Sequence, residues 1–229
     1  MFFDPLYMVV IGIGLALSFG AQMWVKSATS RWDKVALKGG MTGKDIAEKI
    51  LRSRGIRDVR IEVVGGVLSD HYDPRSRTLR LSNAVYNGRS VTAAGIAAHE
   101  VGHAIQDADN YALMSLRQNL VPVARIGTSM GIWMVMIGAF VSQFVAQLGV
   151  LIFGGFVLFT VITLPVEIDA SIRARKLLIK DNIVTGEEAR GVSAVLMAAA
   201  ATYLAAALQS ILQLLYFAHR AGLIGGRRN

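Results

Sequence analysis

The sequence predicts an α-helical membrane protein with four transmembrane helices and a small α+β domain on one side of the membrane. Three stretches carry no charged residue: residues 5–25, the 41 residues 126–166 and the 28 residues 191–218. A helix needs about 20 apolar residues to cross a hydrocarbon core of roughly 30 Å. The stretch 126–166 is twice that length, so we expect a hairpin of two helices that bends near residues 142–149, where polar residues interrupt the aliphatic run. Gly127 and Gly131 have the spacing of a close helix contact.

The composition agrees with a membrane protein and restricts the chemistry that remains. Hydrophobic residues make up 53% of the 229-residue chain and charged residues 17%, against about 25% charged residues in an ordinary soluble domain. The chain contains no cysteine. Disulfides and Cys-ligated metal sites are therefore excluded, and any metal must be bound by His and carboxylate side chains.

The basic residues indicate how the chain is oriented. Of the 24 Lys and Arg residues, 16 fall within residues 26–125, five within 167–190 and three in the basic tail 219–229. By the positive-inside rule, the first two segments lie in the cytoplasm and both termini lie outside. The formal charge of +8 then reflects topology. Because the chain has no P-loop, we expect the lipid bilayer as a partner and no nucleic acid.

The segment 26–125 is long enough for a small domain. Residues 42–45 are typical of a helix start and Gly55 of a helix end, so we expect an amphipathic helix over residues 43–54. Alternating apolar and polar residues over 59–64 and 78–82 predict two strands, and the turn residues between them predict a short antiparallel sheet. Ser90 can cap a further helix that runs to about residue 109.

The last of these helices carries His99, Glu100 and His103. Positions i and i+4 share a helix face, so both imidazoles can bind one metal ion, while Glu100 can reach a water bound to it. Imidazole and carboxylate ligands suit zinc, and a catalytic zinc keeps one position open, where it activates a water. We therefore expect one Zn2+ per chain, with Glu100 as the general base. A helix with two hydrogen-bonded histidines and no metal is the alternative.

The third ligand is found by elimination. A metzincin would have Gly and His where this chain has Gln106 and Asp109, so that class is excluded. A downstream carboxylate ligand must be Asp107 or Asp109, close to the motif, or one beyond the hairpin. Asp107 follows His103 by four residues, but three ligands on successive turns of one helix do not converge readily on a tetrahedral ion. Glu167 follows the third span directly, on the side of the membrane already assigned to the histidines, and is the preferred third ligand.

Three further residues are candidates for supporting roles. Asp169 can accept a hydrogen bond from a ligand imidazole, or it can simply begin a solvated helix. Arg173 can stabilise the tetrahedral oxyanion, or it can be one of the juxtamembrane basic residues. His71 lies in the predicted turn between the strands, where it can contact substrate or the active site, or have a structural or exposed position.

Three sequence motifs together resemble the YugP-type membrane zinc metallopeptidases of bacteria: AHEVGHAIQ at residues 98–106, DHYDP at 70–74 and LPVEIDAS at 164–171. The resemblance covers nearly the whole chain and implies a zincin-like domain with peptidase chemistry. More distantly, the Glu-x-x-Ala element is similar to that of HtpX-type and CAAX-prenyl membrane proteases, which implies that Glu167 is the third zinc ligand. Those relatives usually have Asp after the Ala, where this chain has Ser171, and Asp169 can substitute for it.

The sequence therefore predicts a gluzincin-like zinc metalloendopeptidase of the bacterial cytoplasmic membrane that hydrolyses membrane or membrane-proximal polypeptides at the cytoplasmic face. The alternative is a metal-binding membrane scaffold without turnover, but the presence of Glu100 and a count of only three protein ligands favour the enzyme. A third hypothesis is that the chain is an intramembrane protease of the site-2 type. Charged residues at Arg89 and Asp107 bracket the motif, so we expect the site beside the bilayer.

Overall fold

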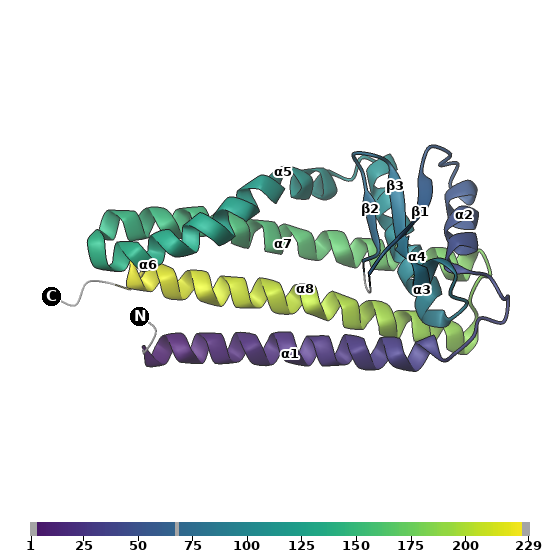
Figure 1. Ribbon diagram of the computed structural model, residues 1–229, viewed down its shortest axis with the longest axis horizontal. Helices are drawn as coiled ribbons and strands as arrows, with labels where there is room; N and C mark the ends of the chain where they lie inside the picture. Colours follow the sequence, from purple (N-terminus) through teal and green to yellow (C-terminus); the bar gives the residue numbers. More distant parts are fainter. Residues whose placement is uncertain (1–3, 67–68, 226–229) are drawn as a thin grey trace. The chain divides into compact units, whose positions relative to one another are not determined.

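A computed structural model of the chain describes residues 4–66 and 69–225. This part of the chain is mostly helical, with one small sheet (Figure 1). The helices are α1 (Pro5–Asp33), α2 (Gly43–Ser53), α3 (Asn83–Tyr86), α4 (Val91–Ala108), α5 (Ala112–Ile126), α6 (Ile132–Val141), α7 (Gln143–Lys180) and α8 (Gly186–Arg220), with a π-helical turn, η1 (Gly127–Gly131), between α5 and α6. The strands are β1 (Arg60–Val64), β2 (His71–Asp73) and β3 (Thr78–Ser82).

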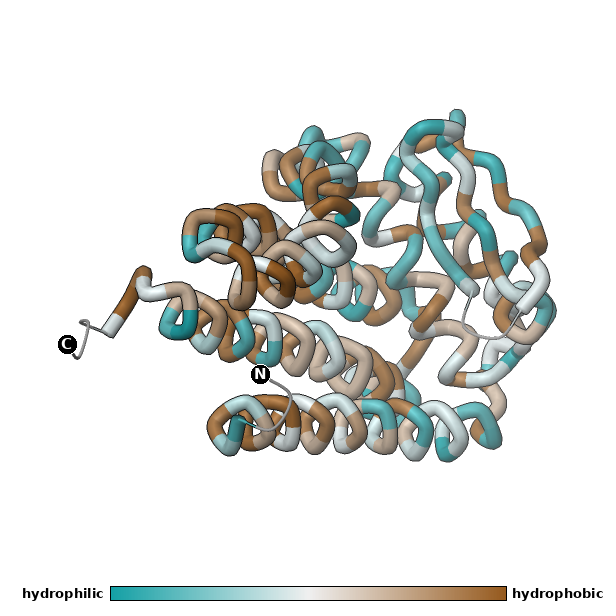
Figure 2. The backbone as a smooth tube through the Cα atoms, turned by 60° about the vertical axis from the view of Figure 1, so that its left-hand side comes forward, coloured by the Kyte–Doolittle hydropathy of each residue, from teal (hydrophilic) through white to brown (hydrophobic). Residues whose placement is uncertain are grey.

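Four helical segments are long and apolar enough to cross a membrane, which matches the predicted number: Pro5–Asp33, Ala112–Val141, Gln143–Lys180 and Gly186–Arg220. Hydrophobic residues recur along these helices, whereas hydrophilic residues are frequent on the strands and their connections (Figure 2). The second and third segments are separated at Ser142, whose backbone is extended with φ −165° and ψ 129°, within the region predicted to bend. The helices extend beyond the uncharged stretches into charged sequence. Helical hydrogen bonds join backbone groups, so a charged side chain does not end a helix.

The chain forms two compact units. Of the described residues, the first unit contains 4–21, 115–165 and 202–225, and the second contains 22–66, 69–114 and 166–201. The three longest helices, α1, α7 and α8, contribute residues to both units. All the predicted zinc ligands belong to the second unit.

Glycines in the first unit allow η1 to approach α7 closely. A Cβ atom added at Gly127 would lie 2.9 Å from the carbonyl oxygen of Ile152, and one at Gly131 would lie 2.8 Å from the backbone nitrogen of Phe153. Both distances are too short for real side chains, so only glycine fits at either position. The structure thus confirms the close helix contact that the spacing of the two glycines predicts.

The sheet belongs to the second unit, and its topology corrects the sequence prediction. The strand order is β1-β3-β2, in which β2 is antiparallel to β3 but β1 is parallel to β3. The predicted antiparallel sheet was wrong for this pair because residues 70–74 were interpreted as turn alone. They contain the additional strand β2, so the chain reverses direction twice between the two predicted strands, which consequently run the same way.

The two helix starts predicted in this unit are confirmed, and each has a capping side chain. At the start of α2, the Thr42 hydroxyl accepts a hydrogen bond from the Asp45 N–H at 3.1 Å, and the Asp45 carboxylate accepts one from the Thr42 N–H at 2.9 Å. This helix ends before Gly55, which has φ +73°. At the start of α4, the Ser90 hydroxyl accepts a hydrogen bond from the Ala93 N–H at 3.1 Å.

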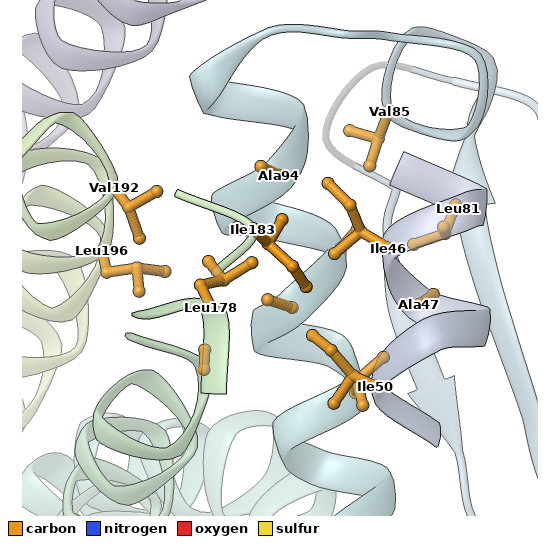
Figure 3. Packing of buried hydrophobic residues seen from close by; sticks show 14 of the residues in the cluster. Ile46, Ala47, Ile50, Leu81, Val85, Ala94, Leu178, Ile183, Val192 and Leu196 are labelled. Carbon is orange, nitrogen blue, oxygen red and sulfur yellow. The ribbon is translucent and has the colours of Figure 1, made fainter. Parts of the chain in front are cut away.

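An apolar core holds α4 between its neighbours in the second unit (Figure 3). Ile46 and Ile50 of α2 and Leu81 of β3 contribute to it, together with Leu178 of α7 and Val192 of α8. All five side chains are completely buried. Burying an aliphatic side chain of this size contributes about 1.5–3 kcal/mol. This core fixes α4 relative to the second-unit part of α7, and these two helices carry the predicted ligands.

Candidate metal centre

The three predicted metal ligands lie together in the structure. His99 and His103 are one turn apart on α4, and Glu167 is on α7. Glu167 Oε2 lies 3.2 Å from His99 Nε2 and 3.5 Å from His103 Nε2. One ligand atom from each residue lies within 4.8 Å of the other two, and no other group of His, Cys, Asp or Glu in residues 4–66 and 69–225 could hold a metal ion in this way.

This donor set fits zinc. Imidazole nitrogen and carboxylate oxygen bind zinc at about 2.0–2.2 Å, and at these lengths the ligand atoms of a tetrahedral ion are about 3.3–3.6 Å apart. The observed separations of 3.2 and 3.5 Å between Glu167 Oε2 and the two histidine nitrogens are close to that range. The imidazole rings of His99 and His103 are inclined at 82° to each other, and both direct Nε2 at the same carboxylate oxygen.

The Nδ1 atom of each imidazole contacts a neighbouring side chain. His99 Nδ1 lies 3.1 Å from the Ser171 hydroxyl, and His103 Nδ1 lies 2.9 Å from the amide oxygen of Gln106. Because an amide oxygen only accepts hydrogen bonds, His103 donates from Nδ1 and presents the lone pair of Nε2. Such contacts orient metal-binding histidines and fix their tautomer.

Asp169 contacts neither imidazole, so the structure does not show the first of the two roles considered for it. Its carboxylate accepts a hydrogen bond from Gln106 Nε2 at 2.8 Å, so it lies one step further from His103. The Asp that the more distant relatives carry after the Ala is replaced by Ser171, which makes the contact to His99 itself. The predicted substitution of Asp169 for that residue is therefore not what the structure shows.

Arg173 and His71, the two other candidates, are bound elsewhere. Arg173 donates to Asp169 at 2.6 Å and to Asp109 at 2.5 Å, and its guanidinium lies 5.8 Å from the ring centre of Tyr111. An Arg held by two carboxylates is a helix-to-helix connection in this structure. The exposed His71, on β2, has Nδ1 at 2.7 Å from the carbonyl oxygen of Ser69.

Glu100 is buried, with 8% of its surface exposed. Its Oε2 accepts a hydrogen bond from the backbone N–H of Tyr72 on β2 at 3.1 Å. The Tyr72 hydroxyl donates to Asp107 at 2.9 Å. Burial and this hydrogen bond raise the pKa of the Tyr72 phenol, so it remains a donor. The strand β2 thus holds Glu100, the candidate general base, in place. Asp107 accepts the hydrogen bond of the Tyr72 hydroxyl.

Negative charge surrounds His103. Burial alone would lower the pKa of His103, but the Glu167 carboxylate beside Nε2 and the charge of Glu100 raise it above its ordinary value. The same carboxylates that favour a proton on the imidazole favour any other cation at this position. The electrostatics of the site therefore agree with the binding of a metal cation.

The sequence reasoning missed three residues that support this centre: Gln106, Ser171 and Tyr72. Gln106 follows His103 by three residues, and Ser171 follows Glu167 by four, so each shares a helix face with a ligand. That spacing could have identified both. Tyr72 contacts Glu100 through its backbone, and a backbone contact leaves no signal in the residue type.

Residues 7–221 match the model of a family described as "Putative neutral zinc metallopeptidase". The chain belongs to this family, which confirms the YugP-type family predicted from the motifs. It is 42% identical over 204 residues to a Bacillus subtilis (strain 168) relative named "Putative membrane protease YugP", covering 89% of this chain and 91% of that protein. No solved structure matches.

Proposed function

We propose that the chain is a membrane-bound zinc metalloendopeptidase that hydrolyses membrane or membrane-proximal polypeptides. The observation that carries the proposal is the convergence of two imidazole nitrogens and a buried carboxylate within 4.8 Å, with Glu100 one residue along the helix from His99. The family supports the chemistry. The four long apolar helices support the membrane location.

Each residue of the centre then has a defined role. His99 and His103 bind zinc through Nε2, and Glu167 binds it through its carboxylate. Zinc, when bound, supplies a Lewis acid that polarises the scissile carbonyl and lowers the pKa of water. Glu100 accepts the proton of the attacking water and returns it to the leaving amine nitrogen. The backbone N–H of Tyr72 holds the Glu100 carboxylate in the orientation needed for both transfers.

The cytoplasmic face is the proposed side of the reaction. The segments 26–125 and 167–190 contain the zinc ligands and 21 of the 24 basic residues, and such segments are retained in the cytoplasm. The proposed membrane-embedded parts are residues 5–25, 126–166 and 191–218, which leaves the basic tail 219–229 outside. Substrates are then polypeptides that reach the cytoplasmic surface of the membrane.

Metal removal and restoration test this function. The full-length protein is purified in detergent, its zinc content is measured, and cleavage of an unfolded casein is followed before and after chelation. We expect about one zinc per chain, loss of cleavage on chelation and recovery when zinc is added back. A protein that binds zinc but cleaves nothing would support the scaffold instead, and a folded protein without zinc affinity would contradict the metal centre.

A further inference from the structure

Gln106 is a completely buried amide between the two helices that carry the ligands. Its Oε1 accepts from His103 Nδ1 at 2.9 Å. Its Nε2 donates to the carbonyl oxygen of Val166 and to the carboxylate of Asp169, each at 2.8 Å. An amide nitrogen has two protons, so both are used. A buried amide is tolerated because its hydrogen bonds are made, and leaving one unmade is costly.

The partners of Gln106 are the immediate surroundings of two different ligands. His103 is itself a ligand on α4, while Val166 precedes the third ligand, Glu167, on α7. One side chain therefore joins the imidazole on the first helix to the backbone of the second helix, next to the carboxylate. The distance of 3.5 Å between His103 Nε2 and Glu167 Oε2 is set by elements that this amide connects.

A second connection between the same helices continues from Asp169. Its carboxylate also accepts from Arg173 Nε at 2.6 Å, and Arg173 donates to Asp109 at 2.5 Å. Asp109 directly follows α4, so the series of hydrogen bonds returns to the C-terminal end of the helix on which it began. The direction of each hydrogen bond is fixed. His103 donates to Gln106, Gln106 donates to Asp169, and Arg173 donates to both aspartates.

We propose that Gln106 is a positioning residue that fixes the His103 imidazole and holds the Glu167 turn of α7 at ligating distance from it. An amide is the side chain that this position requires. A carboxylate could accept from His103, but it could not donate to Val166 and would face the negative charge of Asp169. The inference rests on the proposed zinc site and adds to it the residue that sets the relation of the second ligand to the third.

The first test replaces Gln106 by Leu, which has a similar volume and no hydrogen bonds. Zinc affinity of the full-length protein is measured by competition with a chromophoric chelator, and the visible absorption of the cobalt-substituted protein reports on ligand geometry. We expect zinc affinity to fall about 10- to 100-fold, the range found when a contact to a ligand is lost, with a changed cobalt spectrum. Thermal unfolding of the metal-free protein is measured in parallel.

Thr92→Val is the matched control. Thr92 is buried on the same helix, and its hydroxyl donates to the carbonyl oxygen of Thr29 at 3.0 Å. This variant loses that one hydrogen bond, whereas Gln106→Leu loses three. We expect a lower unfolding temperature with zinc affinity within about twofold of wild type, because a loss of about 10-fold or more in metal affinity arises where the lost contact is to a ligand. If folded Gln106→Leu protein behaves like the control, Gln106 has a merely structural role and the inference is overturned.

A charge exchange provides a test that does not depend on the folding of the Leu variant. In Gln106→Glu, the introduced carboxylate faces Asp169, and we expect weaker zinc binding. Adding Asp169→Asn places an amide donor opposite the new carboxylate at position 106. The hydrogen bond between the two side chains then runs in the reverse direction, and zinc affinity should recover at least tenfold. Equal zinc affinity in the single variant, the double variant and wild type would overturn the inference.

The wild-type protein distinguishes failure of the inference from failure of the proposed function. Tight zinc binding and cleavage by wild type, with unaffected Gln106 variants, would overturn the inference alone. A wild-type protein without zinc affinity would overturn the proposed function and the inference with it.

Discussion

Gly102 lies between the two ligand histidines on α4 and contacts the backbone of α7. A Cβ atom at this position would lie 2.7 Å from the carbonyl oxygen of Ala170 and 3.2 Å from its Cα. A carbon atom approaches a carbonyl oxygen to about 3.3 Å even in a favourable contact. Since the obstacle is helix backbone, Gly102→Ala must move α4 and α7 apart locally by about 0.6 Å, the difference between that limit and the observed distance.

A displacement of this size matters because each helix carries part of the metal centre. Ligand distances in zinc sites are held to about ±0.2 Å, so a shift of His99 and His103 relative to Glu167 should weaken zinc binding at least tenfold. Overpacking of this kind costs about 1–3 kcal/mol of the free energy of unfolding. The better helix propensity of Ala offsets only about 0.5–1 kcal/mol of this.

The assay compares Gly102→Ala with Gly95→Ala on the same helix. A Cβ atom at Gly95 would meet Val192 at 3.8 Å, an ordinary contact, so this control should retain zinc affinity and gain up to about 1 kcal/mol. Zinc affinity is measured by chelator competition, and stability is measured by unfolding of the metal-free protein. Equal affinity and equal stability of the two variants would refute the argument that Gly102 sets the helix separation.

Two further predictions concern the third ligand and the topology. Glu167→Ala should lower zinc affinity by at least about 10- to 100-fold, whereas Asp107→Ala should change it little because Asp107 binds Tyr72; the reverse order in a chelator competition would contradict the assigned ligand. The chain has no native cysteine, so a single cysteine can be introduced by Arg75→Cys, at an exposed position between β2 and β3. This cysteine should react with a membrane-impermeant maleimide only after the cytoplasmic face is opened. Labelling in intact cells would reverse the proposed orientation.

Local signals predicted most of the helical fold. The capping residues Thr42 and Ser90 define helix starts through contacts within three residues of the chain, and such contacts are visible in the sequence. Long uncharged stretches predicted the four apolar helices in the same way. The direction of β1 relative to β3 depended on a strand of three residues, His71–Asp73, which is too short for an alternating pattern to be recognised.

The candidate ligands could be predicted because their spacing is a property of one helix, and because topology left few choices for the third. The supporting contacts could not be predicted in the same way. Whether Asp169 faces an imidazole or Gln106 depends on how α7 is rotated against α4, which is decided by packing at Gly102 and in the apolar core. Arg173 likewise contacts Asp109, a distant partner that only the folded chain brings near, whereas Asp169 precedes Arg173 by four residues on the same helix.

The most direct measurement of the central claim is the zinc content and the casein cleavage rate of Glu100→Gln, determined on the same preparation as wild type. Glu48→Gln, the same change at a surface ion pair with Lys44 on α2, is the matched control and should behave as wild type in both measurements. General-base catalysis contributes about 10²–10⁴-fold, so Glu100→Gln should retain wild-type zinc and lose cleavage by at least about 100-fold. Undiminished cleavage by zinc-loaded Glu100→Gln would contradict the account.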